Sequence, residues 1–357
     1  MQTYEGKAIV LASRPTGKPA PDNFRVEDIA ISHVPDGKVL IQNLWLSIEP
    51  YMMLSMKGSI PMSQRVHANR LNRLSDLYVS GVDIGQVMCG PTIARILVSK
   101  RDDFRAGDMV VAYGGWQDIL IDDGSALLRI DPSAGHVTAQ LGVLGIPGFT
   151  AYGAMREIAQ PKAGETVVVS AAFGPVGSVA GQMARLAGAR SVGIASGPDK
   201  CRRLVTDLGF DVALDRLVPD FAAQLAEACP NGIDVYFENV GGMIWWTVLP
   251  LLNERARIPL CGLVSRYASD GVDDGIDRSM EVIEAIQYKR LLIRGVSVFD
   301  YVPLEADFYR EMAGWVERGD IRYVEDVAEG LASAPQALID VLKGRNNGKM
   351  LVRLGRR

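Results

Sequence analysis

Residues 166–188 read TVVVSAAFGPVGSVAGQMARLAG, and this stretch decides the expected fold. Its β-branched start predicts a short buried strand, and the glycine turn that follows leads into a helical pattern ending near Leu186. In such a turn Gly174 would let the backbone approach a pyrophosphate, and Gly177 would let the helix pack close to the strand. The order strand, glycine turn and helix therefore predicts the phosphate-binding unit of a Rossmann-type domain.

The glycine pattern alone is a weak signal, and a structural turn without a ligand is the alternative. Ala172 stands where the first glycine of GxGxxG would be, and Pro175 has no amide hydrogen to offer a phosphate. A proline in the first turn nevertheless suits the start of a helix, whose N-terminus attracts negative charge. We therefore expect the pyrophosphate to contact Gly174, Pro175, Val176 and Gly177.

The alternation of short apolar runs with helical stretches continues over about residues 160–300. This rhythm is typical of parallel strands joined by crossover helices. One such helix is expected from Pro198 to about Leu208. The further strands are expected at residues 191–195, 211–214, 233–238, 257–261 and 291–298. The sequence thus predicts an α/β fold with a Rossmann-type, doubly wound parallel sheet.

The first 125 residues lack this rhythm. Their strand candidates are shorter, are separated by Gly, Pro and Asp turns, and read KVLIQNLWLSI, TIARILVS and MVVAY. They predict a second, largely antiparallel and barrel-like domain. Residues 305–345 return to a helical pattern and end in KMLVRL, a strand that we expect to rejoin the first domain. We therefore expect a discontinuous domain of residues 1–128 and 310–357, and a nucleotide-binding domain of residues 129–309.

The 357-residue chain is long enough for two domains, with 48% apolar and 22% charged residues. Its net charge of −4 gives no electrostatic reason to expect a nucleic acid or an anionic membrane as partner. The N-terminus lacks the pattern of a signal peptide, and no apolar stretch is long enough to span a bilayer. We expect a cytoplasmic protein.

Cysteine and histidine spacing argues against a metal site. The four cysteines lack CxxC spacing, and no histidine stands within a few residues of a cysteine. The residues concerned are Cys89, Cys201, Cys229, Cys261, His33, His67 and His136. Only Cys89 and His67 fall in the region where a zinc alcohol dehydrogenase would carry its ligands. We expect reduced thiols and no metal ion.

The end of the second predicted strand indicates which dinucleotide would bind. In NAD-binding folds a carboxylate about 20 residues past the glycines grips the ribose 2′-hydroxyl, and residues 194–197 contain none. Lys200, Arg202 and Arg203 begin the next helix instead, where their charge can meet a 2′-phosphate. Ser196, Gly197 and Lys200 form a compact polar cradle, so we expect NADPH rather than NADH, with Lys200 as the main phosphate contact. The alternative is a solvated helix face.

Nine sequence segments carry a family resemblance. They are EPYM (49–52), GGWQ (114–117), IPGFTAY (146–152), VVVSAAFGPVGSVAGQMARLAG (167–188), GFDVALD, NGIDVYFENVGG, CGLVSRY, VFDY and GRNNGKMLV. In this order, along nearly the whole chain, they resemble zinc-independent medium-chain reductases, a family that includes prostaglandin reductases, plant alkenal double-bond reductases and bacterial curcumin reductase. The resemblance implies a GroES-like β-barrel domain beside the Rossmann-type domain, and a homodimer. It also implies NADPH-dependent reduction of the C=C bond of α,β-unsaturated ketones or aldehydes.

The resemblance also assigns roles to single residues. Lys200 looks like the family lysine that contacts the 2′-phosphate. Tyr267 corresponds to a tyrosine proposed as proton donor or enolate stabiliser, and Tyr51 matches a tyrosine of the substrate pocket. These two tyrosines are the expected catalytic residues. The expected cofactor contacts are Gly174, Pro175, Val176, Gly177, Ser196, Lys200, Arg216, Asn239, Cys261, Gly262, Tyr267, Val296, Val298 and Asn346.

This chemistry needs few side chains, because the nicotinamide carries the hydride and the protein supplies orientation and hydrogen-bond donors. Hydride reaches the β-carbon, and the enolate oxygen then needs a donor before the α-carbon is protonated. The phenol of Tyr267 is able to donate, although a backbone amide or the cofactor ribose is an alternative. Tyr51 is alternatively a half-buried packing residue.

Several departures from the family pattern leave other functions open. EPYMM replaces DPYMR, with Glu49 for Asp and Met53 for Arg. Arg216 replaces a tyrosine. It either strengthens 2′-phosphate binding or is merely a surface arginine. Residues 59–83 are polar, irregular and longer than usual, which makes them a candidate for a loop over the active site. The alternatives are a quinone or enoyl-thioester reductase of the same fold, and a non-catalytic nucleotide-binding protein.

Overall fold

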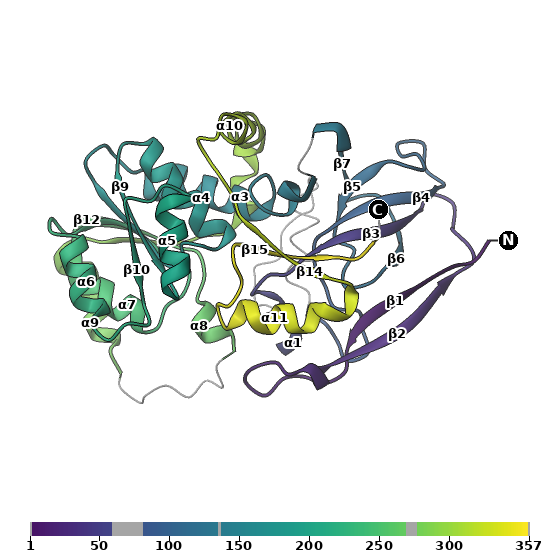
Figure 1. Cartoon of the computed structure of the whole chain (residues 1–357), viewed down its shortest axis with the longest axis horizontal. Coiled ribbons are helices and arrows are strands. Elements are labelled where there is room, and N and C mark those ends of the chain that lie inside the picture. Colours follow the sequence, from purple (N-terminus) through teal and green to yellow (C-terminus); the bar gives the residue numbers. More distant parts are fainter. Residues whose placement is uncertain (1, 59–80, 135–136, 269–276, 356–357) are drawn as a thin grey trace. The chain divides into compact units, whose positions relative to one another are not determined.

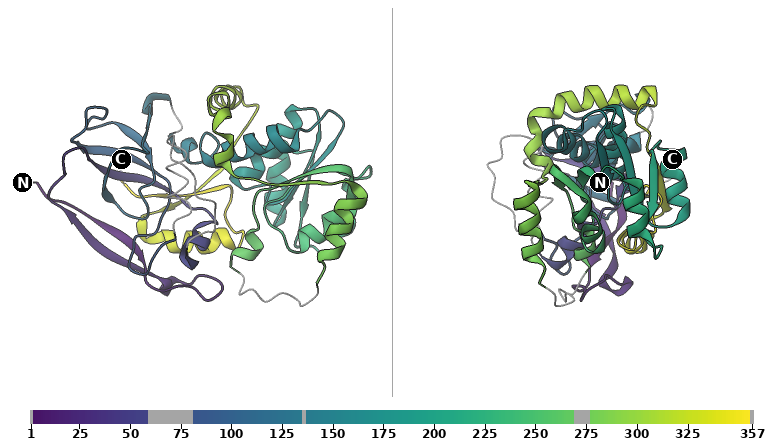
Figure 2. Two further views of the ribbon diagram at one scale, coloured as in Figure 1. Left: turned by 180° about the vertical axis from the view of Figure 1, so that it is seen from behind. Right: turned by 90° about the vertical axis from the view of Figure 1, so that its left-hand side faces the viewer.

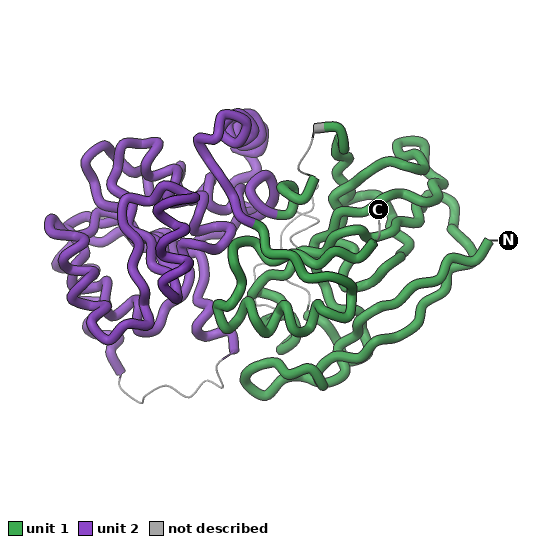
Figure 3. Tube along the Cα trace, in the orientation of Figure 1, with its two compact units in different colours: residues 1–141, 325–357 green, residues 142–324 purple. Residues whose placement is uncertain are grey.

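The structure is a computed structural model that describes residues 2–58, 81–134, 137–268 and 277–355. It divides into two compact units (Figure 3). Unit 1 consists of Met1–Leu141 and Glu325–Arg357, and unit 2 consists of Gly142–Val324. The candidate loop at residues 59–83 lies almost wholly outside the described residues, so its role remains a prediction.

Both unit boundaries lie later in the chain than expected, at 141/142 rather than 128/129 and at 324/325 rather than 309/310. The first difference arises because Leu141 packs with Ile130 and Leu351 of unit 1. The second arises because helix α10 (Glu305–Arg318) packs against α3 (Ile146–Ala154) of unit 2. Apolar packing, which the sequence pattern does not reveal, therefore sets both boundaries.

Unit 2 is built on a six-stranded sheet with the order β10-β9-β8-β11-β12-β13, in which all neighbouring strands run parallel (Figure 1). The strands are β8 (Thr166–Val169), β9 (Arg190–Ala195), β10 (Val212–Asp215), β11 (Ile233–Phe237), β12 (Leu252–Leu260) and β13 (Leu292–Gly295). The chain extends from β8 to β9 and β10 on one side, and then crosses to β11 on the other. This reversal defines a doubly wound sheet, and the expected α/β fold class is confirmed.

The last strand of the sheet is shorter than the expected 291–298. Strand β13 ends at Gly295, and the 3-10 helix η6 (Val298–Leu304) follows. The ring of Tyr301 in η6 packs so closely on Gly153 of α3 that a Cβ at that glycine would overlap it. Packing on α3 thus ends the strand despite the β-branched residues that favour its continuation.

Helices cover both faces of this sheet (Figure 2). Besides α3 and α10, unit 2 contains α4 (Pro175–Leu186), α5 (Pro198–Thr206), α6 (Phe221–Ala228), α7 (Met243–Val248), α8 (Val264–Tyr267), α9 (Ser279–Lys289), η4 (Met155–Ala159) and η5 (Leu249–Leu251). Phe221 and Leu225 of α6 and Val248 of α7 share one buried cluster with Val168 and Tyr236 of the sheet. No helix within the described part of the chain is long and apolar enough to cross a membrane.

Unit 1 contains a sheet with the order β14-β15-β3-β4-β5-β7, in which β6 also pairs with β3, and a separate β1-β2 pair. The strands are β1 (Tyr4–Leu11), β2 (Phe24–Ile31), β3 (Val39–Ser47), β4 (Thr92–Ser99), β5 (Met109–Ala112), β6 (Ile119–Asp122), β7 (Leu128–Ile130), β14 (Glu325–Glu329) and β15 (Lys349–Arg353). Among the described strands of this unit only β14 and β15 run parallel, so the expected largely antiparallel β domain is present. The C-terminal strand β15 pairs with β3, and Leu351 lies opposite Ser47.

Short helices complete unit 1, namely α1 (Met52–Lys57) and α11 (Ala334–Leu342).

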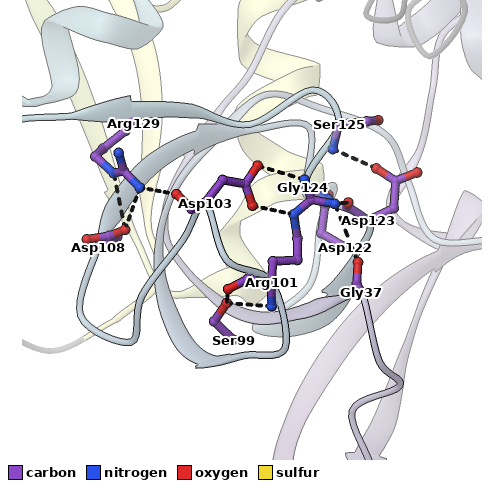
Figure 4. A network of polar contacts seen from close by, with 10 residues as sticks. All are labelled: Gly37, Ser99, Arg101, Asp103, Asp108, Asp122, Asp123, Gly124, Ser125 and Arg129. Atoms are coloured by element: carbon purple, nitrogen blue, oxygen red, sulfur yellow. Dashed lines mark hydrogen bonds and ion pairs between the residues drawn. The ribbon is translucent and has the colours of Figure 1, made fainter.

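A polar network centred on Arg101 links the loops of this unit (Figure 4). The guanidinium donates from Nε and Nη2 to Asp103 at 2.7 Å each, and from Nη1 to the carbonyl of Asp123 at 2.7 Å. Gly124 has φ +76°, a backbone conformation that favours glycine, and a Cβ there would lie 2.6 Å from Nε of Arg101. This network is structural.

Candidate active site

The turn between β8 and α4 has the geometry of a phosphate site. Gly174 is the N-cap of α4 with extended backbone (φ −76°, ψ 167°), and Pro175 is the first helical residue. Helix geometry leaves the amides of Val176 and Gly177 without acceptors inside the helix. These amides and the helix dipole favour an anion at this end of a 12-residue helix.

The two glycines of this turn have different surroundings. A Cβ at Gly177 would lie 2.6 Å from the carbonyl oxygen of Ala171 and 2.9 Å from the Cα of Ala172, so only glycine fits. A Cβ at Gly174 would meet a single atom, the Ala171 oxygen, at 3.2 Å. Gly177 therefore closes the turn against the strand, whereas Gly174 keeps its outer side open for a phosphate group.

Hydrogen bonds to the Asp215 carboxylate and between backbone groups join the ends of β9 and β10. Asp215 Oδ1 accepts hydrogen bonds from the amides of Gly197 at 2.9 Å and Leu217 at 3.0 Å. The amide of Arg216 donates to the carbonyl of Ala195 at 3.0 Å, so Arg216 follows β10 directly beside the end of β9. The Asp215 carboxylate was not predicted, because it lies at the end of the third strand and not of the second.

The three basic residues at the start of α5 are not equivalent. Arg202 forms an ion pair with Asp199 at 3.0 Å, and Arg203 forms one with Asp207 at 2.8 Å. Both arginines are thus paired with carboxylates that lie within α5 or directly after it. Lys200 is half-buried, one residue before Cys201. Burial and the charge of Asp215 raise the pKa of the Cys201 thiol to about 11, and the Lys200 charge opposes this rise.

A buried polar network joins the carboxyl ends of β8 and β11. The Ser170 hydroxyl donates to Glu238 Oε1 at 2.8 Å and accepts a hydrogen bond from the amide of Asn239 at 2.7 Å. The Asn239 side chain donates from Nδ2 to the carbonyl of Ser170 at 2.7 Å. Glu238 has no exposed surface, and Asn239 is 8% exposed. Of these three residues, only Asn239 was predicted from the sequence.

The loop after β12 is attached to the same network. The amides of Cys261 and Gly262 donate to the carbonyl of Glu238 at 2.8 and 3.1 Å. Burial, followed by the charge of Glu238, raises the pKa of the Cys261 thiol to about 12, so this cysteine remains a neutral thiol. The loop therefore presents backbone and a small neutral side chain at the end of β12.

Tyr267, at the end of α8, folds back on this loop. Its phenol oxygen accepts a hydrogen bond from the amide of Leu263 at 3.4 Å, and a Cβ at Gly262 would lie 3.3 Å from it. Burial raises the pKa of Tyr267, so the phenol keeps its proton near neutral pH. The side chain is half-buried. A protonated phenol in this position is able to donate a hydrogen bond.

The expected cofactor-lining strand at Val296 and Val298 is a loop that leads into η6. The amide of Val296 still donates to the carbonyl of Leu260 at 3.0 Å, and Val298 is buried. Between them, the Ser297 hydroxyl is buried and has no hydrogen-bond partner among the described residues. The two valines thus flank an unpaired polar group beside the end of β12.

Two of the expected residues, Tyr51 and Asn346, lie in unit 1. The Tyr51 hydroxyl is 2.5 Å from that of Tyr113, and either can donate. Burial and the nearby Cys89 raise the pKa of Tyr113 well above its usual value. Asn346 donates from Nδ2 to the carbonyl of Gly348 at 2.7 Å. Tyr113 gave no signal in the sequence, because its pairing with Tyr51 spans 62 positions.

The sheet topology explains which of these residues meet in unit 2. Because the strands are parallel, the segments that follow β8, β9, β10, β11, β12 and β13 all emerge at one edge of the sheet. The expected residues at this edge are Gly174, Pro175, Val176, Gly177, Ser196, Lys200, Arg216, Asn239, Cys261, Gly262, Tyr267, Val296 and Val298. In the part of the chain that is described, no three His, Cys, Asp or Glu residues form a group that could hold a metal ion.

The two units match two families of known proteins. Residues 7–130 match the N-terminal domain of oxidoreductase, and residues 175–317 match the zinc-binding dehydrogenase family. Together with the doubly wound sheet, these matches define an oxidoreductase of the medium-chain dehydrogenase/reductase family, to which this chain belongs.

Within this family, the chain is similar to several named reductases. The chain is 44% identical over 356 residues to NADPH-dependent curcumin reductase from Escherichia coli (strain K12), covering 99% of this chain and 98% of the relative. It is 34% identical over 360 residues to 2-alkenal reductase (NADP(+)-dependent) from Nicotiana tabacum, covering 99% of both chains. The crystal structure of CurA in complex with NADPH from Vibrio vulnificus superposes with a TM-score of 0.88 at 41% identity, covering 98% of this chain and 100% of that one. The resemblance inferred from the sequence is thus confirmed.

Proposed function

We propose that this protein reduces the C=C bond of α,β-unsaturated ketones or aldehydes with NADPH. The observation that carries the proposal is the Tyr267 phenol, held against the Gly262–Leu263 backbone beyond β12. In doubly wound folds a dinucleotide lies across the carboxyl edge of the sheet, with its two halves on either side of the point where the strand order reverses. Strands β11 and β12 lie on one side of this point, so Tyr267 belongs to the nicotinamide half.

The carboxyl edge suits the rest of the cofactor. Gly174 leaves room at the N-terminus of α4 for the pyrophosphate. On the adenosine side, we assign the 2′-phosphate to Ser196, Lys200 and Arg216, because Ser196 follows β9, Lys200 lies in the first turn of α5, and Arg216 follows β10 beside the end of β9. Asn239 and the loop at Cys261 line the nicotinamide half, and Asn346 is assigned to the cofactor by its motif. The relatives named for NADPH support this choice of dinucleotide.

The residues of the chain then have defined tasks. When bound, the cofactor supplies a hydride to the β-carbon of the substrate. The Tyr267 phenol donates a hydrogen bond to the enolate oxygen that develops, or a proton to the α-carbon. The Tyr51 hydroxyl, paired with Tyr113, lines the substrate pocket. Cys261 takes no part as a nucleophile, since its raised pKa keeps it a thiol.

The reaction is tested with a simple enone and NADPH deuterated at C4 of the nicotinamide. Oxidation of NADPH should accompany deuterium transfer to the β-carbon of the product, detected by mass spectrometry. Turnover of quinones or enoyl thioesters with no reaction of enones would favour the corresponding alternative. Tight NADPH binding without turnover of any acceptor would identify a nucleotide-binding protein instead.

Two substitutions test the assigned roles. Tyr267→Phe should lower kcat by roughly 10² to 10⁴-fold, the usual range for loss of an acid-base group. Lys200→Ala should weaken NADPH binding and leave NADH binding nearly unchanged. Arg202→Ala is the matched control, because it removes a charge of the same helix that already pairs with Asp199. Equal losses for Lys200→Ala and Arg202→Ala would overturn the assignment of Lys200.

We also infer a homodimer formed through the sheets of unit 2. Strand β13 is the edge strand of that sheet, and it has no partner on its outer side among the described residues. Helix α9 beside it exposes Met280, Ile283 and Tyr288 by 60%, 52% and 70%. Exposed apolar residues next to an open edge favour association.

Light scattering after gel filtration should give twice the mass of the chain. Ile283→Lys should lower this mass at micromolar concentration, whereas Val205→Lys, at an exposed apolar position of α5, should not. An unchanged mass for Ile283→Lys would exclude α9 from the interface.

A further inference from the structure

Glu238 is a buried carboxylate at the carboxyl end of β11 whose hydrogen-bond donors are all neutral. Oε1 accepts from the Ser170 hydroxyl at 2.8 Å and from the amide of Val240 at 2.6 Å, and Oε2 accepts from the Tyr236 hydroxyl at 2.8 Å. No Lys or Arg of the described residues forms an ion pair with it. Its exposed surface is 0%.

This arrangement is unusual, because burying a charge without a counter-charge is unfavourable. Carboxylates inside proteins are normally paired with cations or bound to metals. Here three donated hydrogen bonds stabilise the carboxylate, but they leave its net charge uncompensated. The roles assigned above to the site residues make no use of this charge.

Glu238 lies next to the loop that is assigned to the nicotinamide, so its charge can act on that part of the cofactor. Its backbone carbonyl holds the amides of Cys261 and Gly262, so the residue lies directly against the loop assigned to the nicotinamide. The field of the carboxylate reaches this loop, since it contributes to the raised pKa of the Cys261 thiol. Asn239, which follows Glu238, is assigned to the same half of the cofactor.

We propose that the Glu238 carboxylate favours the oxidised form of the bound nicotinamide and so makes bound NADPH a stronger hydride donor. The proposal rests on the proposed function. The nicotinamide ring is neutral in NADPH and carries one positive charge in NADP⁺. When a hydride, one proton with two electrons, leaves C4 for the β-carbon and a proton joins the α-carbon, the ring gains that charge. A fixed negative charge nearby stabilises the product ring.

The test measures binding rather than turnover. Dissociation constants of NADP⁺ and NADPH are determined by equilibrium titration without any acceptor, for the wild type and for Glu238→Gln. The amide retains the size of the carboxylate, and its oxygen can still accept from Ser170 and Val240. The variant should bind NADP⁺ about ten-fold more weakly relative to NADPH, the size expected for a unit charge about 12 Å away at an effective dielectric constant near 20.

Tyr236→Phe is the matched control. It removes one hydrogen bond from the same carboxylate but leaves the charge, so the ratio of the two constants should stay at its wild-type value. If Glu238→Gln weakens both nucleotides equally, the residue only holds the loop and the proposal is wrong. A ratio that shifts as much in Tyr236→Phe as in Glu238→Gln would contradict it as well.

The wild type supplies a test that does not depend on the folding of any variant. NADP⁺ should bind to it no more weakly than NADPH, and a more than ten-fold preference for NADPH would overturn the proposal. Failure of the proposed function has a different signature. In that case enones are not reduced, while the effect of Glu238→Gln on the ratio persists.

Discussion

Lys349 Nζ lies 3.0 Å from Glu49 Oε1, although 300 positions separate the two residues. Their side chains are only 3% and 8% exposed, and the lysine also donates to the Ser47 hydroxyl at 2.5 Å. Glu49 follows β3 and Lys349 begins β15, so the pair fastens the C-terminal strand to the N-terminal sheet. Burial lowers the pKa of Lys349, and the Glu49 charge opposes this effect.

Removing one partner of this pair should lower the stability of the protein far more than removing both charges. Lys349→Met leaves the Glu49 carboxylate buried without its cation, and should lower the free energy of unfolding by roughly 3–5 kcal/mol. The double variant Glu49→Gln with Lys349→Met should recover most of this loss. Urea denaturation measures both. If the double variant is as unstable as the single one, packing of the lysine stem and not charge is responsible.

The two glycines of the β8–α4 turn should respond differently to alanine. In Gly177→Ala the new methyl group meets the Ala171 oxygen at 2.6 Å, so the turn must open, at a cost of about 1–3 kcal/mol in stability. Gly174→Ala meets the same atom at 3.2 Å and should fold normally while binding NADPH more weakly. Thermal unfolding and nucleotide titration separate the two effects. Normal NADPH binding by Gly174→Ala would remove this glycine from the phosphate site.

The sequence predicted these glycine roles because strand, turn and helix are local features. The same β-branched run, glycines and proline predict β8, its turn and α4 without knowledge of the rest of the chain. The alternation of strands and helices also predicted the doubly wound sheet. The last strand was predicted too long because the packing of Tyr301 on Gly153 ends it, and this contact joins segments about 150 residues apart.

The polar network beneath the site could not be predicted in this way. Ser170 and Glu238 are 68 positions apart, and they meet only because β8 and β11 are neighbours in the sheet. The Asp215 carboxylate was overlooked because its place beside Gly197 depends on the pairing of β9 with β10. Sequence motifs identified residues with a family counterpart, whereas partners fixed by strand order required the structure.

Ala171 has a backbone conformation that favours glycine, with φ +48°. Left-handed backbone costs a residue with a Cβ about 1–2 kcal/mol, and glycine avoids most of this cost but has more freedom when unfolded. Ala171→Gly should therefore keep the stability of the protein or raise it by up to about 1 kcal/mol.

Ala180→Gly in the middle of α4 is the matched control, and it should lower the stability by about 1 kcal/mol or more. Thermal unfolding of both variants measures the difference. Equal destabilisation would mean that Ala171 is not strained.

Cys229 should be unreactive until the protein unfolds. It is 3% exposed, and burial raises the pKa of its thiol to about 11, with the charge of Arg190 opposing the rise. At pH 8 about 0.1% of Cys229 in the folded protein is then the reactive thiolate, against about 10% for a thiol with the usual pKa of 9.0. Alkylation by iodoacetamide, followed by peptide mass spectrometry, should be at least about 100-fold slower in buffer than in urea.

The same raised pKa fixes the sign of a pH effect on stability. Because the folded state holds the Cys229 proton more tightly than the unfolded state, its contribution to stability is complete below pH 9 and is lost as the pH rises toward 11. Cys229→Ala removes this contribution, so the variant should lose less stability than the wild type between pH 9 and pH 11. Identical pH profiles for the two proteins, or rapid alkylation of folded protein at pH 8, would show that this thiol is not held in its neutral form by burial.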